Sequence, residues 1–399
     1  MNERAAARPG ETVDVLVYVQ HLLGIGHLRR AAVLVRSLDR AGLKTVLVSG
    51  GMPVEGLDIG AAGFVQLPPA RAMDETFKIL ADAHGQPVDE AWMAARRDQL
   101  RALYHKLRPR VLIVELFPFG RRKMRFELLP LLDAARESHP RPQILCSMRD
   151  VLVDDKNAEK TAWMIETFER YFDLVLLHGD PEFLPLERSF SRTHEIANRL
   201  HYTGYVLDDA PLADPADQAG RGEVIVSMGG GAVGAPLIEA ALAGRAQTPL
   251  KDATWRVLIG PNMPEDSFQA IIARAPAGIL VERARPDFRA LLAGGRLSIS
   301  LGGYNTVLEV LAAGIPAVVV PYSGGTETEQ TLRARLLAER GALTLVHEAE
   351  LSPATLAAAV RTALARGVDG HKPRLAGLDT SGADRTVRIV RERLAIVDS

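Results

Sequence analysis

The segment from Ser298 to Arg335 constrains the fold of this chain more than any other stretch. It reads SISLGGYNTVLEVLAAGIPAVVVPYSGGTETEQTLRAR, which predicts a strand, a glycine turn, a helix, a second strand, and a loop that enters another helix. In open α/β sheets, ligands bind beyond the carboxyl ends of strands, where helix N-termini offer unpaired N–H groups. The segment therefore predicts half of a nucleotide-binding site, and the rest of the chain must supply the other half.

The same alternation of apolar strands and helical patterns occurs twice along the chain. The first series opens at residues 12–19, an apolar run typical of a parallel strand that is covered on both faces. Residues 207–222 are rich in Asp, Pro, Ala and Gly and have little to bury, which indicates a linker. We therefore expect an α/β protein with two Rossmann-like, doubly wound domains, 12–206 and 223–382, which face each other across a cleft.

The two ends of the chain are expected to lie outside these sheets. Residues 1–11 are predicted to form a disordered lead. From Ala383 onward the pattern is that of an amphipathic helix, with Val387, Val390 and Leu394 on one stripe. We expect residues 383–399 to form a helix that crosses back and packs on the first domain.

Composition and charge are those of an ordinary globular protein. The chain has 399 residues, of which 47% are hydrophobic and 24% charged, and its formal net charge of -1 gives no general attraction to nucleic acid. The single cysteine, Cys146, excludes an intramolecular disulfide and lies in an apolar pattern typical of a packed thiol. Because we find no signal-peptide core and no run of about 18 apolar residues, a cytoplasmic location is expected.

A glycine turn after the first predicted strand carries the first candidate for catalysis. Gly24 and Gly26 would let a ligand approach the backbone, and the helix behind them favours an anion. His27 heads that helix, where an imidazole can move protons and where the helix N-terminus would depress its pKa. The alternative is a bare strand-to-helix turn, since the third glycine of a dinucleotide fingerprint would fall at Arg29.

A second glycine-rich turn, SMGGGAVG, follows the first strand of the second series. Its Gly229, Gly230 and Gly231 would form a backbone nest that holds phosphate oxygens without a lysine. It is not a Walker A loop, because no Gly-Lys-Ser/Thr follows, so nucleotide hydrolysis with magnesium is disfavoured.

The helix inside the 298–335 segment carries polar side chains on one side. At about 100° per residue, Asn305, Thr306 and Glu309 fall on one side of the helix, and valines and leucines fall on the other. Glu309 suits two ribose hydroxyls, or else it points to solvent. Glu329 and Gln330 open the next helix and suit sugar hydroxyls, or else they are exposed residues of a first turn.

Charged residues follow two strands of the first series. Glu115 ends the earlier strand and is the second candidate base. Arg121 and Arg122, beside two phenylalanines, would receive an anionic or lipid-phosphate acceptor or touch a membrane, and the alternative is a solvated loop. Arg149 and Asp150 end the later strand and either form an ion pair that shapes the cleft or contribute to catalysis.

Three motifs together resemble the GT-B glycosyltransferases, and glycosyltransferase family 28 in particular. They are GIGH after the first strand, SMGGG after the linker, and GGYNTVLEVLAAGIPAVVVPY followed by TETEQTLRA. The best-known member of that family moves N-acetylglucosamine from UDP onto a lipid-linked acceptor of peptidoglycan synthesis. The resemblance implies an inverting, metal-independent transfer that needs no cofactor. Asp154 and Asp155 are comparable to the metal-binding aspartates of other sugar transferases, but those enzymes have a different fold, so no metal site is expected.

The resemblance also assigns roles to the candidate residues. It implies that the donor diphosphate lies on the Gly229–Gly231 turn, the ribose on Glu309, and the sugar hydroxyls near Glu329 and Gln330. The helix that starts near Gly302 and Gly303 would stabilise the charge of the departing diphosphate. The same comparison places His27 on the acceptor side, as a base or as a contact to an acceptor phosphate.

We therefore expect a glycosyltransferase of cell-envelope or polysaccharide synthesis that uses a nucleotide sugar, a UDP-sugar, and a lipid-linked or anionic acceptor. Peripheral contact with the inner face of the membrane is part of this hypothesis. Two alternatives are a nucleotide-sugar hydrolase or 2-epimerase, and a non-catalytic nucleotide-sugar-binding protein. The sugar, the acceptor, the oligomeric state and the choice between His27 and Glu115 as base stay open.

Overall fold

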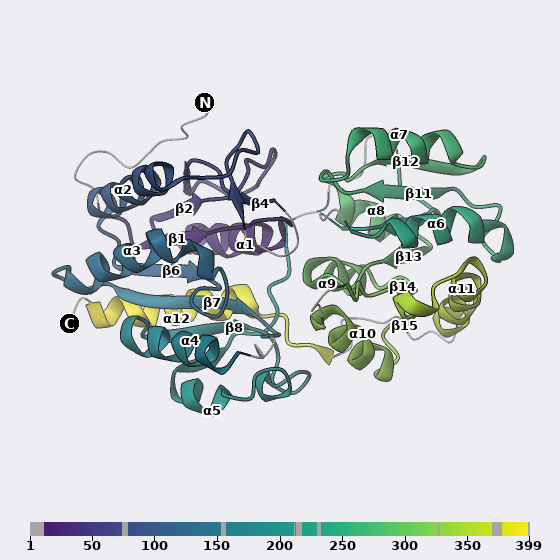
Figure 1. Ribbon diagram of the computed structural model, residues 1–399. Coiled ribbons are helices and arrows are strands. Elements are labelled where there is room, and N and C mark those ends of the chain that lie inside the picture. The colour runs from purple at the N-terminus through teal and green to yellow at the C-terminus, as the bar shows by residue number, and fades with distance from the viewer. Residues whose placement is uncertain are drawn as a thin grey trace. The chain divides into compact units, whose positions relative to one another are not determined.

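The computed structural model describes residues 12–73, 79–152, 157–210, 212, 218–229, 233–324, 328–368 and 377–397 (Figure 1). The chain divides into two compact units, Met1–Leu207 with Asp379–Ser399 (unit 1) and Asp208–Leu378 (unit 2). The lead predicted at residues 1–11 lies outside the described residues.

Unit 1 contains a seven-stranded parallel sheet in the order β3-β2-β1-β6-β7-β8-β9. Its strands are β1 (Val15–Val19), β2 (Thr45–Ser49), β3 (Gly63–Gln66), β6 (Val111–Glu115), β7 (Gln143–Arg149), β8 (Leu174–His178) and β9 (Leu200–Tyr202). A short antiparallel pair consists of β4 (Arg71–Ala72) and β5 (Leu80–Ala81). The helices of the first part of the chain are α1 (Gly26–Arg40), α2 (Glu90–Leu107), α3 (Arg125–Glu137), α4 (Ala158–Tyr171) and α5 (Thr193–Ile196).

Alternate residues of β1 pack into two separate hydrophobic cores. Leu16 and Tyr18 join the core that includes α2, α3 and α4. Val15, Val17 and Val19 join the core that includes α1. Because successive side chains of a strand point to opposite faces, both faces of this sheet are covered, as the apolar run at residues 12–19 predicts.

The last helix, α12 (Gly382–Val397), packs on unit 1 (Figure 1). Ile389, Val390 and Leu394 are buried in the core formed with α1 and the sheet. The Arg391 guanidinium donates to the carbonyl of Ala41, the residue that follows α1, at 2.7 Å. The prediction that the C-terminal helix returns to the first domain is confirmed.

Unit 2 contains a six-stranded parallel sheet in the order β12-β11-β10-β13-β14-β15. Its strands are β10 (Val224–Ser227), β11 (Trp255–Ile259), β12 (Ile279–Arg283), β13 (Leu297–Ser300), β14 (Ala317–Val319) and β15 (Thr344–Leu345). Its helices are α6 (Ala235–Gly244), α7 (Glu265–Arg274), α8 (Phe288–Gly294), α9 (Tyr304–Ala313), α10 (Glu329–Glu339) and α11 (Pro353–Val368).

Part of the stretch predicted as a linker packs against unit 2. A Cβ on Gly220 would lie 2.6 Å from the backbone of Leu291 in α8, so only glycine fits at this contact. The Arg289 guanidinium, also in α8, donates to the carbonyl of Ala210 at 2.9 Å. Among the described helices, none is long and apolar enough to cross a membrane.

Candidate functional site

The predicted site residues gather where the strand order of each sheet reverses. In unit 1 the first strand, β1, lies between β2 and β6, and in unit 2 the first strand, β10, lies between β11 and β13. Glu115 ends β6, and His27 lies in the helix that follows β1. Gly229 and Gly302 follow β10 and β13. Ligands bind at the carboxyl ends of strands at such switch points.

His27 and Glu115 contact each other, although 88 residues separate them in the sequence. The distance between His27 Nδ1 and Glu115 Oε1 is 2.9 Å, and both side chains are buried. Arg30, one turn further along α1, donates to the same carboxylate oxygen. Because an ionised carboxylate only accepts hydrogen bonds, Nδ1 of His27 carries the proton and Nε2 is the unprotonated nitrogen.

Burial and neighbouring charges set the protonation states of this pair. Burial, followed by the Arg121 guanidinium, lowers the pKa of His27 to about 3. Burial opposes ionisation of Glu115, but Arg30 and the hydrogen bond from His27 outweigh it and lower the pKa of Glu115 to about 2. The depressed pKa of His27 therefore has the predicted direction, but burial is its main cause. At neutral pH the pair consists of a neutral imidazole and a carboxylate.

The geometry gives His27 and Glu115 different chemical capacities. Glu115 is buried and accepts hydrogen bonds from His27, Arg30 and Ser147, so its oxygens are occupied within the protein. A carboxylate held in this way orients an imidazole and stabilises it once protonated. The arrangement therefore favours His27 as the base and Glu115 as its partner.

Sequence reasoning missed Arg30 and Ser147, which contact this pair, and His178, which contacts Ser147. Arg30 lies three positions after His27, a spacing that places both on one face of a helix and that could have indicated their proximity. Ser147 is paired with Glu115 in the β6–β7 register, and His178 is paired with Arg149 in the β7–β8 register. No local motif marks Ser147 or His178, because only the strand register brings them to this place.

The basic stretch after β6 differs in part from the prediction. The Arg121 Nε donates to the carbonyl of Gln20 at 2.8 Å, which joins the loop after β6 to the loop after β1. Arg122 is exposed, and its guanidinium carbon lies 5.2 Å from the centroid of the Trp163 ring.

The two phenylalanines of this stretch are not on the surface. Phe117 and Phe119 are 0% and 5% exposed and pack in the core beside α3 and α4. Each makes ring contacts with other core aromatics, such as the 5.6 Å centroid distance between Phe119 and Phe168. Both rings are therefore part of the core of unit 1, whereas Arg122, which follows them in the sequence, is exposed.

The remaining acceptor-side candidates differ in their exposure to solvent. Asp150 is buried and accepts a hydrogen bond from the Tyr205 hydroxyl at 3.0 Å, so its carboxylate serves an internal contact. Arg149 is half-buried at the end of β7. A Cβ on Gly24 would meet no heavy atom within 4 Å, and Gly26 begins α1. Packing therefore does not require a glycine at position 24.

The predicted donor residues of unit 2 lie close together. Gly229 has a φ of 71°, which favours glycine, and a Cβ there would lie 3.9 Å from Thr306 Oγ1. A Cβ on Gly302 would lie 3.1 Å from the Cβ of Gln330. The turns after β10 and β13 thus meet the starts of α9 and α10. Gly230 and Gly231 lie outside the described residues.

Helix α9 begins where an anion could bind. Gly303 is its N-cap and offers no side chain, so a ligand can approach the first N–H groups of the helix. Asn305 and Glu309 are half-buried on the same helix. Glu329 opens α10, and the Gln330 side-chain oxygen accepts from the backbone N–H of Tyr322 at 3.2 Å, which fixes the loop after β14.

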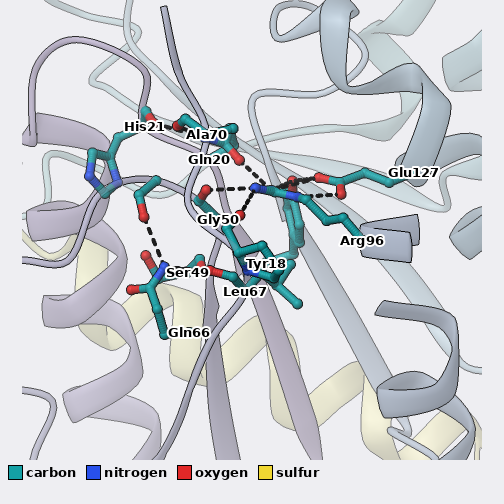
Figure 2. Close-up of polar contacts among 12 residues, drawn as sticks. Tyr18, Gln20, His21, Ser49, Gly50, Gln66, Leu67, Ala70, Arg96 and Glu127 are labelled. Carbon is teal, nitrogen blue, oxygen red and sulfur yellow. Dashed lines mark hydrogen bonds and ion pairs between the residues drawn. The ribbon is translucent and has the colours of Figure 1, made fainter. Parts of the chain in front are cut away.

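A buried ion pair connects several segments of unit 1 (Figure 2). Arg96 of α2 and Glu127 of α3 are both 0% exposed, and the Arg96 Nε donates to Glu127 Oε2 at 2.7 Å. Arg96 also donates to the Gly50 carbonyl at 2.9 Å and to the side-chain oxygen of Gln20 at 2.6 Å. Gln20 in turn donates to the Ala70 carbonyl at 2.9 Å. One guanidinium therefore joins the loops after β1 and β2 to two helices.

Because three of its histidines are buried, we expect unit 1 to become less stable in acid. Burial is the main cause that lowers the pKa of His21 to about 4 and those of His27 and His178 to about 3. The unfolded chain, with histidine pKa values of about 6.5, binds protons that the folded chain excludes. The free energy of unfolding should thus fall as the pH drops from about 6.5 toward 4. Each histidine contributes up to about 1.4 kcal/mol for each pH unit. Above about pH 6.5 these histidines should have no effect on the free energy of unfolding.

Urea unfolding at several pH values between about 7.5 and 4.5 measures this dependence. His178→Gln removes one titrating group, so the slope of the free energy against pH should decrease by the contribution of about one proton. Equal slopes for the variant and the wild type would contradict the protonation state assigned to His178.

Within the described ranges, no group of three or more His, Cys, Asp or Glu side chains could hold a metal ion. Asp154 and Asp155 lie outside those ranges. Cys146 is buried, and burial raises the pKa of its thiol well above the ordinary value. The prediction of a packed thiol is confirmed.

Sequence comparison identifies a family match in the second unit and relatives of the chain. Residues 225–371 match the glycosyltransferase family 28 C-terminal domain. The UDP-N-acetylglucosamine--N-acetylmuramyl-(pentapeptide) pyrophosphoryl-undecaprenol N-acetylglucosamine transferase of Exiguobacterium sibiricum is 28% identical over 169 residues, which is 42% of this chain and 46% of the relative. The transferase of the same name from Desulforudis audaxviator is 40% identical over 88 residues, 22% of this chain and 24% of the relative. The matches thus span less than half the length of these curated relatives.

Solved structures resemble the chain over nearly its whole length. The calicheamicin glycosyltransferase CalG4 has a TM-score of 0.58 at 19% identity, and the match covers 98% of this chain and 100% of that one. MurG of Acinetobacter baumannii has a TM-score of 0.56 at 18% identity, covering 95% of this chain and 99% of that one. At such identities the likeness shows the fold alone. The chain therefore has the GT-B fold that its motifs predict, and residues 225–371 of its second unit are similar to the C-terminal domain of glycosyltransferase family 28.

Proposed function

We propose that this protein is a glycosyltransferase that moves a sugar from a UDP-sugar onto a lipid-linked acceptor. The observation that carries the proposal is the buried contact between His27 Nδ1 and Glu115, which prepares a base at the switch point of unit 1. The family 28 domain of unit 2 supports a nucleotide-sugar donor. The acceptor class comes from the relatives, whose printed names include a pyrophosphoryl-undecaprenol acceptor.

The proposed donor site uses the residues that gather at β10 and β13. The diphosphate would lie against the backbone at Gly229 and the N-terminus of α9 at Gly303, where N–H groups and the helix dipole stabilise negative charge. Glu309, on the same helix, would accept hydrogen bonds from the ribose hydroxyls. Glu329 and Gln330, at the start of α10, would contact the sugar.

The proposed reaction is a single displacement at the anomeric carbon. The Nε2 of His27 takes the proton of the acceptor hydroxyl while the oxygen of that hydroxyl forms a bond to the anomeric carbon. The bond from that carbon to the diphosphate oxygen breaks on the opposite face, and its electron pair leaves with the diphosphate, so the configuration inverts. Glu115 stabilises the imidazolium that forms at His27. In this proposal the N–H groups of α9 stabilise the leaving group, and no metal or cofactor takes part.

Binding of a nucleotide sugar tests the proposal without knowledge of the acceptor. We expect one member of a panel of UDP-, GDP- and dTDP-sugars, with UDP-N-acetylglucosamine included, to raise the melting temperature, because a ligand that binds only the folded state stabilises it. Glu309→Ala should weaken that binding by about 10- to 100-fold, since it removes hydrogen bonds to a charged group.

The matched control is Glu339→Ala, which removes a glutamate exposed on α10 of the same unit. It should bind the nucleotide sugar like the wild type. If no nucleotide sugar at millimolar concentration changes the melting temperature, the donor-site assignment is wrong.

A further inference from the structure

A row of buried polar side chains continues from Glu115 across the sheet of unit 1. The Ser147 hydroxyl lies 2.5 Å from Glu115 Oε2, and His178 Nε2 lies 3.0 Å from that hydroxyl. On the other side of the imidazole, the Thr203 hydroxyl lies 2.8 Å from His178 Nδ1. All four side chains belong to residues that are at most 2% exposed. Glu115, Ser147 and His178 come from β6, β7 and β8, so neighbouring strands supply successive members of the row.

A count of protons fixes the direction of these hydrogen bonds. Glu115 is ionised beside Arg30 and can only accept, so the single proton of the Ser147 hydroxyl is donated to Glu115. Ser147 must then accept from His178, which places the His178 proton on Nε2. His178 is neutral, because burial lowers its pKa to about 3, so its Nδ1 is an acceptor and faces the Thr203 hydroxyl. The carbonyls of Gly204 and Leu177, at 3.0 and 3.3 Å, compete for the proton of that hydroxyl, and the shorter distance of 2.8 Å to Nδ1 favours donation to His178.

The opposite direction is incompatible with the charge on Glu115. If Ser147 donated to His178 Nε2, a lone pair of the hydroxyl oxygen would face the carboxylate at 2.5 Å. An ionised carboxylate has no proton to place in that contact. Every hydrogen bond in the row therefore points toward Glu115.

We infer that Ser147 and His178 are positioning residues that hold Glu115, and through it His27, in the orientation needed for proton transfer. The inference rests on the proposed role of His27 as base. His27 and Arg30 both contact Oε1 of Glu115, whereas Ser147 contacts Oε2, so Ser147 opposes rotation of the carboxylate about its terminal bond. Hydrogen bonds that run in one direction also polarise one another. Neither Ser147 nor His178 can touch substrate, because both are at most 1% exposed.

Nuclear magnetic resonance of the full chain with nitrogen-labelled histidines tests the direction of the row and needs no ligand. At neutral pH we expect His178 to be protonated at Nε2 and bare at Nδ1, and His27 to be protonated at Nδ1 and bare at Nε2. Histidine-to-glutamine variants at positions 27 and 178 assign the signals. A His178 that carries its proton on Nδ1 overturns the inference.

Turnover of two serine variants tests the positioning role. Ser147→Ala should lower kcat by about tenfold, the effect of one hydrogen bond to a charged group, and leave the KM for the nucleotide sugar unchanged. Ser49→Ala is the matched control, because Ser49 is another buried strand serine of the same sheet and its hydroxyl has no hydrogen-bond partner among the described residues. Its kcat should equal that of the wild type. Equal kcat values for the two variants overturn the inference.

A pair of substitutions at His178 separates positioning from general packing. The side-chain amide of glutamine reaches the place of Nε2 and can still donate to Ser147, whereas that of asparagine reaches only the place of Nδ1. We expect His178→Gln to keep kcat within about threefold of the wild type and His178→Asn to lose about tenfold. An equal loss in both, or no loss in His178→Asn, overturns the inference.

These outcomes can be told apart from a failure of the proposed function. If His27→Gln turns over the nucleotide sugar like the wild type, His27 is not the base and both proposals fail. If His27→Gln is inactive while Ser147→Ala and His178→Asn have wild-type kcat, only the positioning role fails. The melting temperature of each variant shows whether it folds. If a variant folds poorly, the tautomer measurement still tests the inference, because it uses the wild type.

Discussion

Replacement of His27 by glutamine is expected to lower the kcat of sugar transfer by about 100- to 10,000-fold, the range that general-base catalysis supplies. Glutamine can keep a hydrogen bond to Glu115 but cannot take a proton from an acceptor hydroxyl. The His27 side chain is buried against Glu115 and Arg30, in unit 1, whereas the proposed donor residues belong to unit 2. Nucleotide-sugar binding should therefore stay within about twofold of the wild type. Release of the nucleoside diphosphate in the presence of a membrane-lipid extract measures turnover.

Two further variants sharpen this result. Glu115→Gln keeps the shape of the side chain and removes the charge that stabilises an imidazolium, so its kcat should also fall, with unchanged donor binding. His201→Gln is the matched control, because His201 is a half-buried histidine of the same unit that takes no part in the proposed site. A His27→Gln variant with the kcat of the His201→Gln control would exclude His27 as the base.

Replacement of Arg96 by methionine is expected to lower the free energy of unfolding by about 3–5 kcal/mol. The change leaves the fully buried carboxylate of Glu127 without the guanidinium that neutralises it. It also removes the donors to the Gly50 carbonyl and the Gln20 side chain, so the loops after β1 and β2 lose a shared anchor. Urea unfolding monitored by circular dichroism measures the change.

The neighbouring residue on α2 offers a matched control. Arg97 forms an ion pair with Asp98 in which the side chains are 37% and 60% exposed, so Arg97→Met should change the free energy of unfolding by less than about 1 kcal/mol. Adding Glu127→Gln to Arg96→Met removes the buried charge and should restore part of the stability. Similar losses of unfolding free energy for Arg96→Met and Arg97→Met would show that the buried pair of Arg96 and Glu127 does not stabilise unit 1 in this way.

Patterns that are local in sequence predicted much of the fold and pointed to the candidate donor residues of unit 2. Buried parallel strands are nearly continuous apolar runs, so segments such as residues 224–227 and 297–300 stand out in the sequence. Gly302, Gly303 and Glu309 lie within one turn-helix segment, where spacing along the chain is also spacing in space. The return of α12 to unit 1 could be predicted from its apolar stripe, although the stripe alone does not identify the surface on which the helix packs.

The contacts of His27 and Glu115 could not be predicted in the same way. Ser147 meets Glu115 only because β6 and β7 pair in one particular register, and a shift of one residue would turn its side chain to the other face. The ion pair between Arg96 and Glu127 joins two helices through a buried contact that no local sequence motif predicts. Phe117 lies near Arg121 and Arg122 in the sequence but packs in the core, and the neighbouring arginines do not indicate that burial.

The most direct test of the proposed function is the transfer of labelled sugar to lipid. Purified protein is incubated with UDP-N-acetylglucosamine carrying a radiolabelled sugar, or with whichever nucleotide sugar raises its melting temperature, and with a membrane-lipid extract; the organic phase is then counted. We predict label in the organic phase with the wild type and with His201→Gln, and at least about 100-fold less with His27→Gln. Label that stays entirely in the aqueous phase with the wild type, or that reaches the lipid equally well with His27→Gln, would contradict the proposed reaction.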